Sequence, residues 1–231
     1  MTTPAQAAAA AETTGLPPGE GERFAGFGVM GLPFSSGHVL ATRRFPASSI
    51  GPAYTSVWHR DPNGRWAFWQ NQPDELSCPR YFATTESETK RVDIDLSWPA
   101  ETTLRVEIPD VGLEWTSHLT ATPVTRALNA VGRGLPESAW RSRALLAAMG
   151  PMAGRALGAG RVGMVGMTPN DQSFIANPIR MWVIDEASAR LGGEDLGPVG
   201  PLDEQARVGD FWIPQRGVFA IGRTIMTAGE G

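Results

Sequence analysis

The sequence predicts a mainly β protein in which an antiparallel meander forms a barrel or a curved two-layer sheet, with a helical insert around residues 124–158. Three observations predict this fold class. Short central segments alternate apolar and polar residues, and five of the eight tryptophans lie in or beside them. Asn63-Gly64 separates two aromatic segments, which is a strong hairpin signal. After residue 124 the strand period gives way to Ala- and Leu-rich segments typical of helices.

The N-terminal part of the chain contains few strand signals. Residues 1–22 are rich in Ala, Thr, Pro, Gly and Glu without a period, and they predict a disordered tail. A single β-rich domain is expected over residues 23–226, followed by a short tail at 227–231. Because the segment from 24 to 50 is rich in Gly, Pro and Ser, only one strand is expected there, around residues 38–44.

The centre of the chain contains the clearest strand patterns. The predicted hairpin joins Tyr54–Arg60 to Arg65–Asn71, and in its first strand Tyr54, Ser56 and Trp58 share one face. Three further segments alternate with period two: residues 91–98, 103–108 and 113–122. Alternation of this kind is typical of an antiparallel meander with one buried face.

The helical insert and the last strands complete the expected fold. Pro136 lies near the first turn of a helix over residues 137–157, and Gly150-Pro151 must end or kink that helix. Further strands are expected over residues 161–167, 173–185 with a bend at Asn177-Pro178, 188–191, 210–213 and 217–226. A total of eight to ten strands is sufficient to close a barrel or to build two layers.

Composition excludes several classes of protein. A net charge of −4 does not provide the basic stripe that nucleic-acid binding requires. The single cysteine, Cys78, cannot form an internal disulfide, and no segment is predicted to be a signal peptide or an integral membrane segment. We therefore expect a cytoplasmic protein, and the preference for arginine over lysine indicates a bacterial genome rich in GC. Lys90 is the only lysine, so a Schiff base has one candidate residue.

Several local patterns have two interpretations. Gly158–Gly163 matches a dinucleotide-binding pattern, but a helix precedes it and strands follow, so a glycine-rich turn is predicted. Asp93 and Asp95 form either a carboxylate site with Glu107 or Glu114 or, as we expect, a solvated sheet face. Cys78 is either a nucleophile activated by Arg80 or a small buried residue, and we expect the second. The histidines lie too far apart in sequence for metal-ligand spacing, so neither a metal nor another cofactor is expected.

The candidate site residues lie on the predicted strands. If the barrel interior is partly polar, His118 can act as a base oriented by Glu114, and Asp210 lies in an aromatic segment with polar anchors. The candidate catalytic residues are His118, Glu114 and Asp210. The candidate ligand-binding residues are Trp58, Trp66, Trp115, Trp212 and Arg216. For each of them a structural role, as an exposed, packed or ion-paired residue, is the competing interpretation.

The arrangement of strands and helices resembles the lipocalin-like superfamily, in particular the lipocalin-like proteins related to carotenoid hydratases and tocopherol cyclases. The resemblance rests on the aromatic meander through Trp58, Trp66, Trp98 and Trp115, and on the strand–turn–strand segment from Val162 to Asp185. It covers about half of the chain and includes no diagnostic motif. It implies an enclosed apolar ligand and, in some members, cofactor-free hydration or cyclisation by acids in the pocket. No catalytic residue of the family matches a position of this sequence.

Two functions follow from these patterns. The first is binding of an apolar small molecule, such as a lipid, a terpenoid or a polyketide-like compound, in an aromatic-lined β pocket. Cofactor-independent acid/base isomerisation, cyclisation or hydration would then be chemistry open to the site. The second is a non-catalytic interaction or structural module with a closed aromatic core. The sequence favours the first, leaves open whether the protein is an enzyme, and does not identify the ligand or the oligomeric state.

Overall fold

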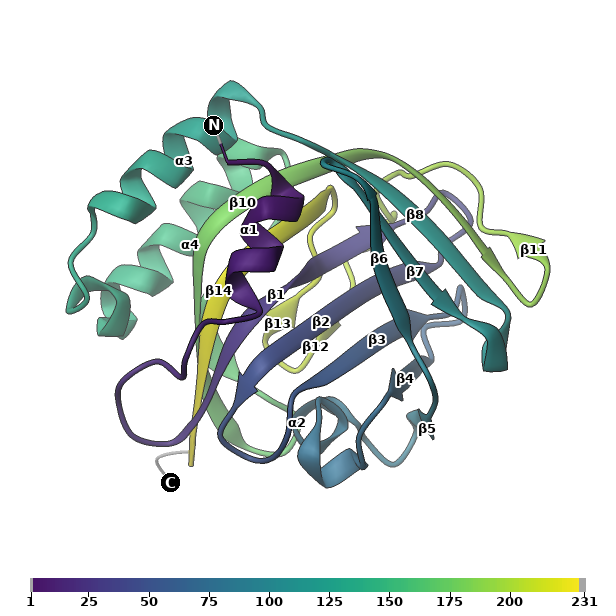
Figure 1. Ribbon diagram of the computed structural model, residues 1–231, viewed down its shortest axis with the longest axis horizontal. Helices are drawn as coiled ribbons and strands as arrows, with labels where there is room; N and C mark the ends of the chain where they lie inside the picture. The colour runs from purple at the N-terminus through teal and green to yellow at the C-terminus, as the bar shows by residue number, and fades with distance from the viewer. Residues whose placement is uncertain (1, 229–231) are drawn as a thin grey trace.

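The protein is mainly β and is built on one large curled sheet that forms a half-barrel, as the computed structural model of residues 2–228 shows (Figure 1). The strand order is β5 (Glu88–Arg91), β4 (Trp66–Gln70), β3 (Tyr54–Arg60), β2 (Val39–Ser48), β1 (Glu22–Pro33), β14 (Gly217–Ala228), β10 (Gln172–Leu191), β8 (Leu113–Thr120), β7 (Thr103–Ile108) and β6 (Asp95–Ala100). Neighbouring strands are antiparallel except β4 and β5, which are parallel. The predicted mainly β class and the curved sheet are therefore confirmed.

Four very short strands complete the β structure. β9 (Val165–Met167) and β11 (Glu194–Asp195) pair with β10, whereas β12 (Arg207–Val208) and β13 (Phe211–Trp212) form a separate two-stranded sheet. Residues 2–228 thus contain more strands than the eight to ten expected. The strand expected over residues 91–98 is also shifted, because β5 ends at Arg91, residues 92–94 are not in a strand, and β6 begins at Asp95. In contrast, the two strands expected over residues 173–191 are one continuous strand, β10, with an irregularity just after Pro178.

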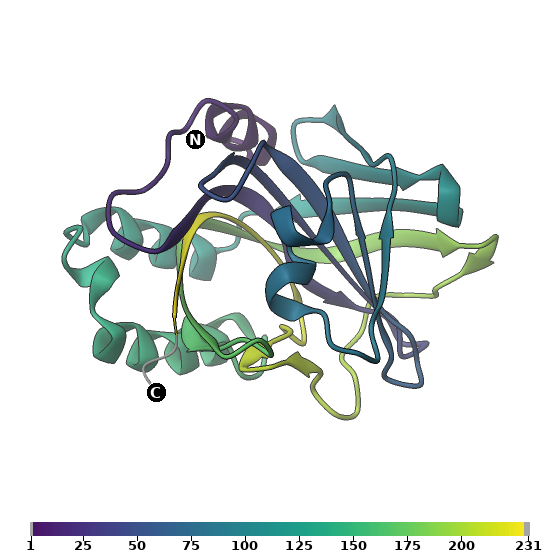
Figure 2. The same ribbon diagram turned by 90° about the horizontal axis from the view of Figure 1, so that it is seen from below.

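The helical insert predicted around residues 124–158 is confirmed. It consists of α3 (Pro123–Gly134), a 3-10 turn (Ala139–Arg141) and α4 (Arg143–Leu157). Pro151 lies inside α4 and the helix ends at Gly158, whose positive φ caps it. Both helices lie beside β10 (Figure 2). The side-chain amide of Asn129 in α3 bonds to the backbone of Met181 in β10, and α4 lies near β9 and β10. The remaining helical turns are Asp74–Leu76, α2 (Pro79–Phe82) and Pro109–Val111.

The N-terminal segment forms a helix where the sequence predicts a disordered tail. Thr3 and Gln6 form a capping box for α1 (Pro4–Ala11), and Ala7, Ala8 and Ala11 are buried. The short alanine side chains allow close packing against the sheet, and the pattern of the sequence does not indicate this tertiary contact. Of the predicted C-terminal tail, residues 227 and 228 belong to β14, whereas residues 229–231 lie outside the described part of the chain.

Strand β1 was not predicted, although it lies in the middle of the sheet between β2 and β14. Its sequence is interrupted by glycines, which are unfavourable in isolated strands. At Gly28, an added Cβ would lie 1.9 Å from the carbonyl oxygen of Thr42, so only glycine allows β2 to approach this closely. The glycines that obscure the strand pattern are therefore required by the close packing of the strand.

The predicted hairpin is present, and both of its faces are buried. In β3, Tyr54 and Trp58 belong to one apolar cluster, whereas Val57 belongs to another on the opposite face. The faces follow the predicted alternation, but β3 has six buried residues in succession rather than one exposed face. The sheet formed by β1–β4 therefore separates two apolar regions.

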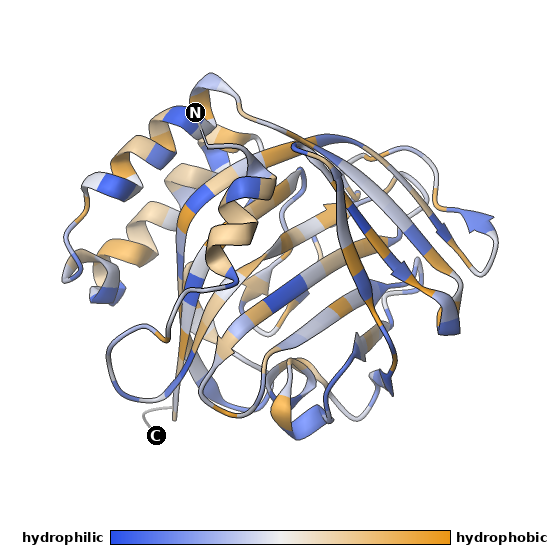
Figure 3. Ribbon diagram, viewed as in Figure 1, coloured by the Kyte–Doolittle hydropathy of each residue, from blue (hydrophilic) through white to orange (hydrophobic). Residues whose placement is uncertain are grey.

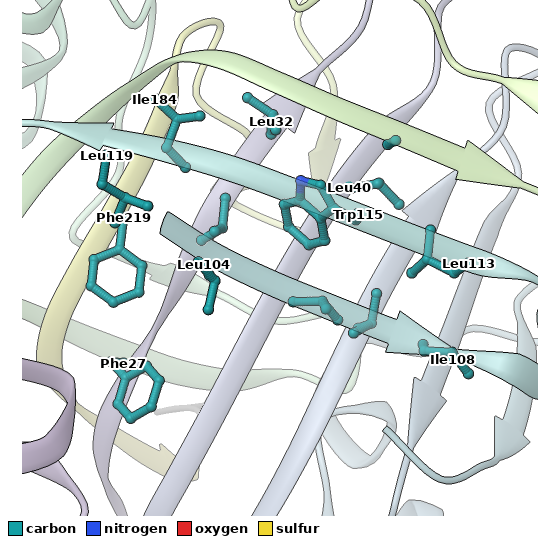
Figure 4. Packing of buried hydrophobic residues seen from close by; sticks show 14 of the residues in the cluster. Phe27, Leu32, Leu40, Leu104, Ile108, Leu113, Trp115, Leu119, Ile184 and Phe219 are labelled. Carbon is teal, nitrogen blue, oxygen red and sulfur yellow. The ribbon is translucent and has the colours of Figure 1, made fainter. Parts of the chain in front are cut away.

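The first of these regions, here called the closed core, lies between β1–β4 and the strands β6–β8. Side chains from both layers meet there, with Trp115 of β8 near its centre (Figure 4). Helix α1 covers part of the same region through its buried alanines. Hydrophilic and hydrophobic residues alternate along β7 and β8, which places the hydrophilic residues on the outer surface (Figure 3).

Candidate functional site

The second region contains a cavity of about 120 Å³, here called the main cavity. It lies against β1, β2, β10 and β14 and is covered by the end of α4, residues 162–164, and the segment around β13. Its lining is mostly apolar and includes three methionines and two aromatic rings close to its cover: Met30, Met164, Met181, Phe211 and Trp212. An apolar cavity with few polar groups is typical of a small-molecule site.

A smaller cavity of about 40 Å³, here called the inner pocket, adjoins the main cavity. The two share five lining residues: Arg43, Phe45, Ala176, Phe211 and Thr224. The rest of the inner pocket is formed by aromatic residues of the sheet and of α2, with Cys78 between them. The shared residues make the two spaces neighbouring parts of one site.

The cover of the main cavity depends on close packing between α4 and the chain that follows it. A Cβ on Gly154 would lie 2.2 Å from the carbonyl oxygen of Gly160, so any other residue would push the two segments apart. Gly158 and Gly160 have positive φ values and reverse the chain direction. As a result, residues 162–164 return along α4 and contribute to the cavity wall.

Arg43 of β2 is the main charged group at the site. The pairing of β1 with β14 shifts between Val29 and Gly31, and the pairing of β1 with β2 is also irregular there. Arg43 Nη1 donates to the carbonyl oxygens of Val29 and Thr42, and Nη2 donates to that of Met30 at 3.2 Å. The guanidinium thus satisfies carbonyl groups that the irregular strand pairing leaves available.

Two aromatic rings hold the guanidinium of Arg43 in place. Its central carbon lies 4.8 Å from the ring centre of Trp58 and 5.2 Å from that of Phe211. These distances are typical of cation–π contacts, which strengthen when the cation is removed from water. Arg43 is only 6% exposed, so it is a buried cation fixed between an apolar sheet face and the cavity cover.

The positive charge of Arg43 is not neutralised within the described residues 2–228. None of the ion pairs formed there includes Arg43. Burial lowers the pKa of Arg43 to about 10, which still leaves it protonated at neutral pH. Its neighbours Cys78 and Tyr54 are neutral, because burial raises the pKa of each. A buried cation without a counter-ion is costly, so this position favours an anion.

The inner pocket also contains polar atoms without partners among the described residues. The Nε1 of Trp58 is buried and forms no hydrogen bond, and the same holds for the Oγ of Ser56, which lies on β3 between Tyr54 and Trp58 but does not line the pocket. The hydroxyl of Tyr54 is hydrogen-bonded to the Sγ of Cys78 at 3.6 Å. In the main cavity, Asn177 of β10 has a buried Oδ1 without a partner. Buried polar groups without partners are rare in folded proteins. Those of Trp58 and Asn177 belong to residues that line the two cavities, whereas Trp115 carries one in the closed core.

Two of the predicted ligand-binding residues line these cavities. Trp58 contributes to the inner pocket and Trp212 to the main cavity. Trp212 is also contacted by two arginines at its outer side, because the guanidinium carbons of Arg161 and Arg207 lie 4.5 and 5.3 Å from its ring centre. Trp58 and Trp212 come from distant parts of the chain, and the fold places both next to Phe211.

The other predicted ligand-binding residues lie elsewhere. Trp115 is 1% exposed inside the closed core, on the other side of the sheet. Trp66 packs at the edge of the apolar clusters around Phe68 and Phe211. Arg216 is ion-paired with Asp185, to which it donates two hydrogen bonds of 2.6 Å. It also donates to a carbonyl oxygen of α4.

The predicted catalytic residues are not brought together. His118 and Glu114 are exposed on the outer face of β8, where His118 contacts the hydroxyl of Thr103 at 3.3 Å. Asp210 accepts a hydrogen bond from the backbone nitrogen of Met167 at 2.9 Å and thereby joins β9 to the turn between β12 and β13. None of the three lines the main cavity or the inner pocket.

The most informative residue of the site, Arg43, was missed in the sequence. A signal is present, because Ala41 and Phe45 lie on the same strand face as Arg43, and both are apolar. A charged residue between two apolar residues on one strand face indicates either an exposed strand edge or a buried charged residue with a functional role. The expected strand stopped at residue 44, so this face was not recognised.

The remaining sequence patterns adopt structural roles. Residues 158–163 follow a helix and lead into β9, so this segment is a turn rather than the start of a helix. Lys90 lies exposed on β5, and its Nζ donates to the carbonyl oxygen of Asp110. Within residues 2–228, no cluster of three or more His, Cys, Asp or Glu side chains could hold a metal ion. In the same part of the chain, no helix combines the length and the apolar character needed to cross a membrane.

Comparisons with known proteins add a structural likeness. No protein-family model matches the chain, and no curated protein matches it. Among solved structures, the chain is similar to the crystal structure of acetoacetate decarboxylase from Legionella pneumophila subsp. pneumophila str. Philadelphia 1. The sequences are 12% identical, the match covers 93% of this chain and 87% of that chain, and the TM-score is 0.42. No functional conclusion follows from a likeness at this level.

Proposed function

We propose that the main cavity binds an apolar small molecule. The observation that supports this proposal is an apolar cavity next to a buried, uncompensated cation, at a place where the opposite face of the same strands is filled by side chains. Three methionines in its lining can adapt to the shape of a ligand, since their side chains are unbranched and flexible. The lipocalin-like resemblance remains part of this proposal, and the curled sheet with an apolar cavity supports it.

The chemistry available at the site favours binding over acid/base catalysis. Among the described residues, no Asp, Glu or His lines either cavity. A general acid or base must come within hydrogen-bond reach of the substrate. Isomerisation, cyclisation or hydration by His118, Glu114 or Asp210 would therefore need a different site or a rearranged chain, and the proposal is limited to ligand binding.

A specific observation favours a second candidate, an interaction module. Several apolar side chains are exposed on the outer helices, with Val131 of α3 at 56% and Met152 of α4 at 64% exposure. Exposed apolar residues can form part of a contact surface. In that case the closed core would support the fold, the outer surface of α3 and α4 would bind another protein, and the main cavity would bind no ligand.

Methionine methyl NMR during a titration with 1-octanol tests ligand binding directly. We expect saturable shifts of the methyl signals of Met30, Met164 and Met181, which line the main cavity. Met152 serves as an internal control, because it lies on the outer side of α4 and should not shift. Shifts confined to Met152, or no saturable shift at any methionine, would contradict binding in the cavity and favour the interaction module.

Two matched variants of α4 sharpen this test. Ala153 lines the main cavity, whereas Ala156 lies exposed on the same helix. We expect Ala153→Phe to fill the cavity and to weaken 1-octanol binding at least roughly tenfold, since the ligand loses its space. Ala156→Phe should bind as the wild type does. Circular dichroism of both variants checks that they remain folded, and equal affinities for both would rule out the main cavity as the site.

A further inference from the structure

We propose that the ligand of the main cavity carries a carboxylate, which the free edge of the Arg43 guanidinium binds. This inference rests on the proposed function and names the class of ligand: an amphipathic monocarboxylate, with its apolar part in the main cavity. It follows from the hydrogen bonds that Arg43 makes, from those that it leaves unmade, and from the charges around the cavity.

The first step is an account of the five N–H donors of Arg43. Both donors of Nη1 and one of Nη2 are used by the backbone carbonyl groups of Val29, Thr42 and Met30. Within residues 2–228, the Nε–H and the second N–H of Nη2 have no hydrogen-bond acceptor. Arg43 lines both cavities, so its side chain lies where the two spaces adjoin.

The second step is the chemistry that such a pair of donors recognises. Nε and Nη2 together form a fork that matches the two oxygens of a carboxylate. The same protein uses this fork twice. Arg44 binds Glu12 through Nε and Nη2 at 3.0 and 2.9 Å, and Arg216 binds Asp185 through the same two atoms at 2.6 Å each. Of these three arginines, only Arg43 has a fork that binds no side chain among the described residues.

The third step is the charge that the site can compensate. The other arginine in the lining, Arg223, faces Glu137, whose oxygens lie 3.3 and 3.4 Å from its Nη1. The thiol of Cys78 and the phenol of Tyr54 are neutral neighbours. The lining therefore offers one uncompensated positive charge, which suits a monoanion better than a phosphate dianion. The apolar remainder of the cavity requires that the anion carry an apolar group.

The size of the cavity suggests the first probes. A medium-length alkyl carboxylate combines one carboxylate with a flexible apolar chain, so octanoate is the test ligand. Octanamide has nearly the same shape and no charge, and 1-octanol reports on apolar binding alone. We expect octanoate to bind the wild-type protein at least roughly tenfold more tightly than octanamide near neutral pH, measured by calorimetry and by methionine methyl shifts.

Arg43→Met tests whether the guanidinium is responsible. This variant should lose at least roughly tenfold in octanoate affinity while its 1-octanol affinity stays within about twofold of the wild type. Arg43→Lys retains the charge but not the fork, and we expect an intermediate loss. Arg44→Met is the matched control, because Arg44 is the next residue in the same strand and is already paired with Glu12; its octanoate affinity should not change.

The outcomes separate the two proposals. If 1-octanol binds but octanoate and octanamide bind equally well, the carboxylate proposal is wrong and the proposed apolar cavity stands. If none of the three ligands shifts the cavity methionines, the proposed function itself fails. If Arg43→Met does not fold, the comparison of octanoate with octanamide on the wild-type protein decides the question by itself.

Discussion

The two faces of β1–β4 are built from the same strands but end in different packing. One face meets the regular strands β6–β8 and helix α1, and its side chains form the closed core. The other meets short and irregular elements: α2, the two-residue strands β12 and β13, and the residues around the end of α4. The main cavity, the inner pocket and Arg43 all lie on this second side.

The difference shows how the covering elements decide whether an apolar face closes. Two layers of regular strands place side chains at even intervals, so that the chains of one layer can fill the spaces of the other. Short turns and glycine-rich segments provide fewer side chains, and they leave space against an equally apolar sheet face. The alternation of apolar residues therefore predicts which side chains share a face, but not whether that face is filled.

The largest expected effect is a loss of stability when a tryptophan is removed from the closed core rather than from the cavity side of the sheet. Trp115→Ala removes a fully buried side chain from the closed core and should lower the free energy of unfolding by about 3–5 kcal/mol. Trp212→Ala removes a half-buried side chain from the main cavity, where space already exists, and should cost about 1 kcal/mol. Urea denaturation measures both. Equal losses would show that the two sides of the sheet are packed equally well.

The next effect concerns a histidine pair on the closed-core face. His59 stacks on Trp69, and its Nε2 lies 2.8 Å from the Nδ1 of His38. Burial, followed by the charge of His38, lowers the pKa of His59 to about 4, whereas the unfolded chain has the ordinary value of 6.5. Between these values the unfolded state binds more protons, so stability must fall as the pH decreases, by about 3 kcal/mol in total.

Substitution of His59 by Gln should remove this part of the pH dependence. The free energy of unfolding at about pH 7 and about pH 4.5 is compared for His59→Gln, for His118→Gln and for the wild type. His118 is exposed on β8 and serves as the control, so its variant should retain the wild-type loss on acidification. An unchanged pH dependence in His59→Gln would show that the pair does not titrate as its burial requires.

The smallest expected effect concerns the cover of the closed core. Glu12 follows α1 and forms two hydrogen bonds with Arg44 of β2, but both side chains are partly exposed. Glu12→Gln should therefore lower the free energy of unfolding by only about 0.5–1 kcal/mol, and less at high salt. A loss above about 2 kcal/mol would mean that the ion pair, rather than the buried alanines, holds α1 in place.

Particular elements show what could be predicted from the sequence and why the rest could not. The hairpin over Tyr54–Gln70 and the meander through β7 and β8 were predicted because turn residues and alternation are local signals. Helix α1 and strand β1 were missed, since short alanine and glycine side chains become favourable only where another segment packs closely against them. Residues 2–228 contain 14 strands, more than expected, because the shortest strands form only by pairing with neighbouring strands and carry no pattern of their own.

The sequence pattern predicted only some of the residues that line the two cavities. Trp58 and Trp212 line the cavities, as proposed for ligand-binding residues, whereas Trp115 has an equally strong aromatic signal and lies in the closed core. The pattern that contains Trp58 is the same kind of pattern that contains Trp115. What distinguishes them is the element that covers each face, and this depends on contacts between distant segments.

By itself, the sequence determined the mainly β class, the central hairpin and meander, the helical insert, and the faces on which the side chains of β3 lie. These features depend on local turn geometry and on periods of 2 and 3.6 residues, which any short segment carries within itself. Only the tertiary structure decided that one face of β1–β4 closes while the other retains a cavity, and that Arg43 lies buried there with its Nε–Nη2 edge unoccupied within the described residues. The physical reason is that burial, cavities and unpaired donors depend on which distant segments meet, and neighbouring residues in the sequence do not specify that.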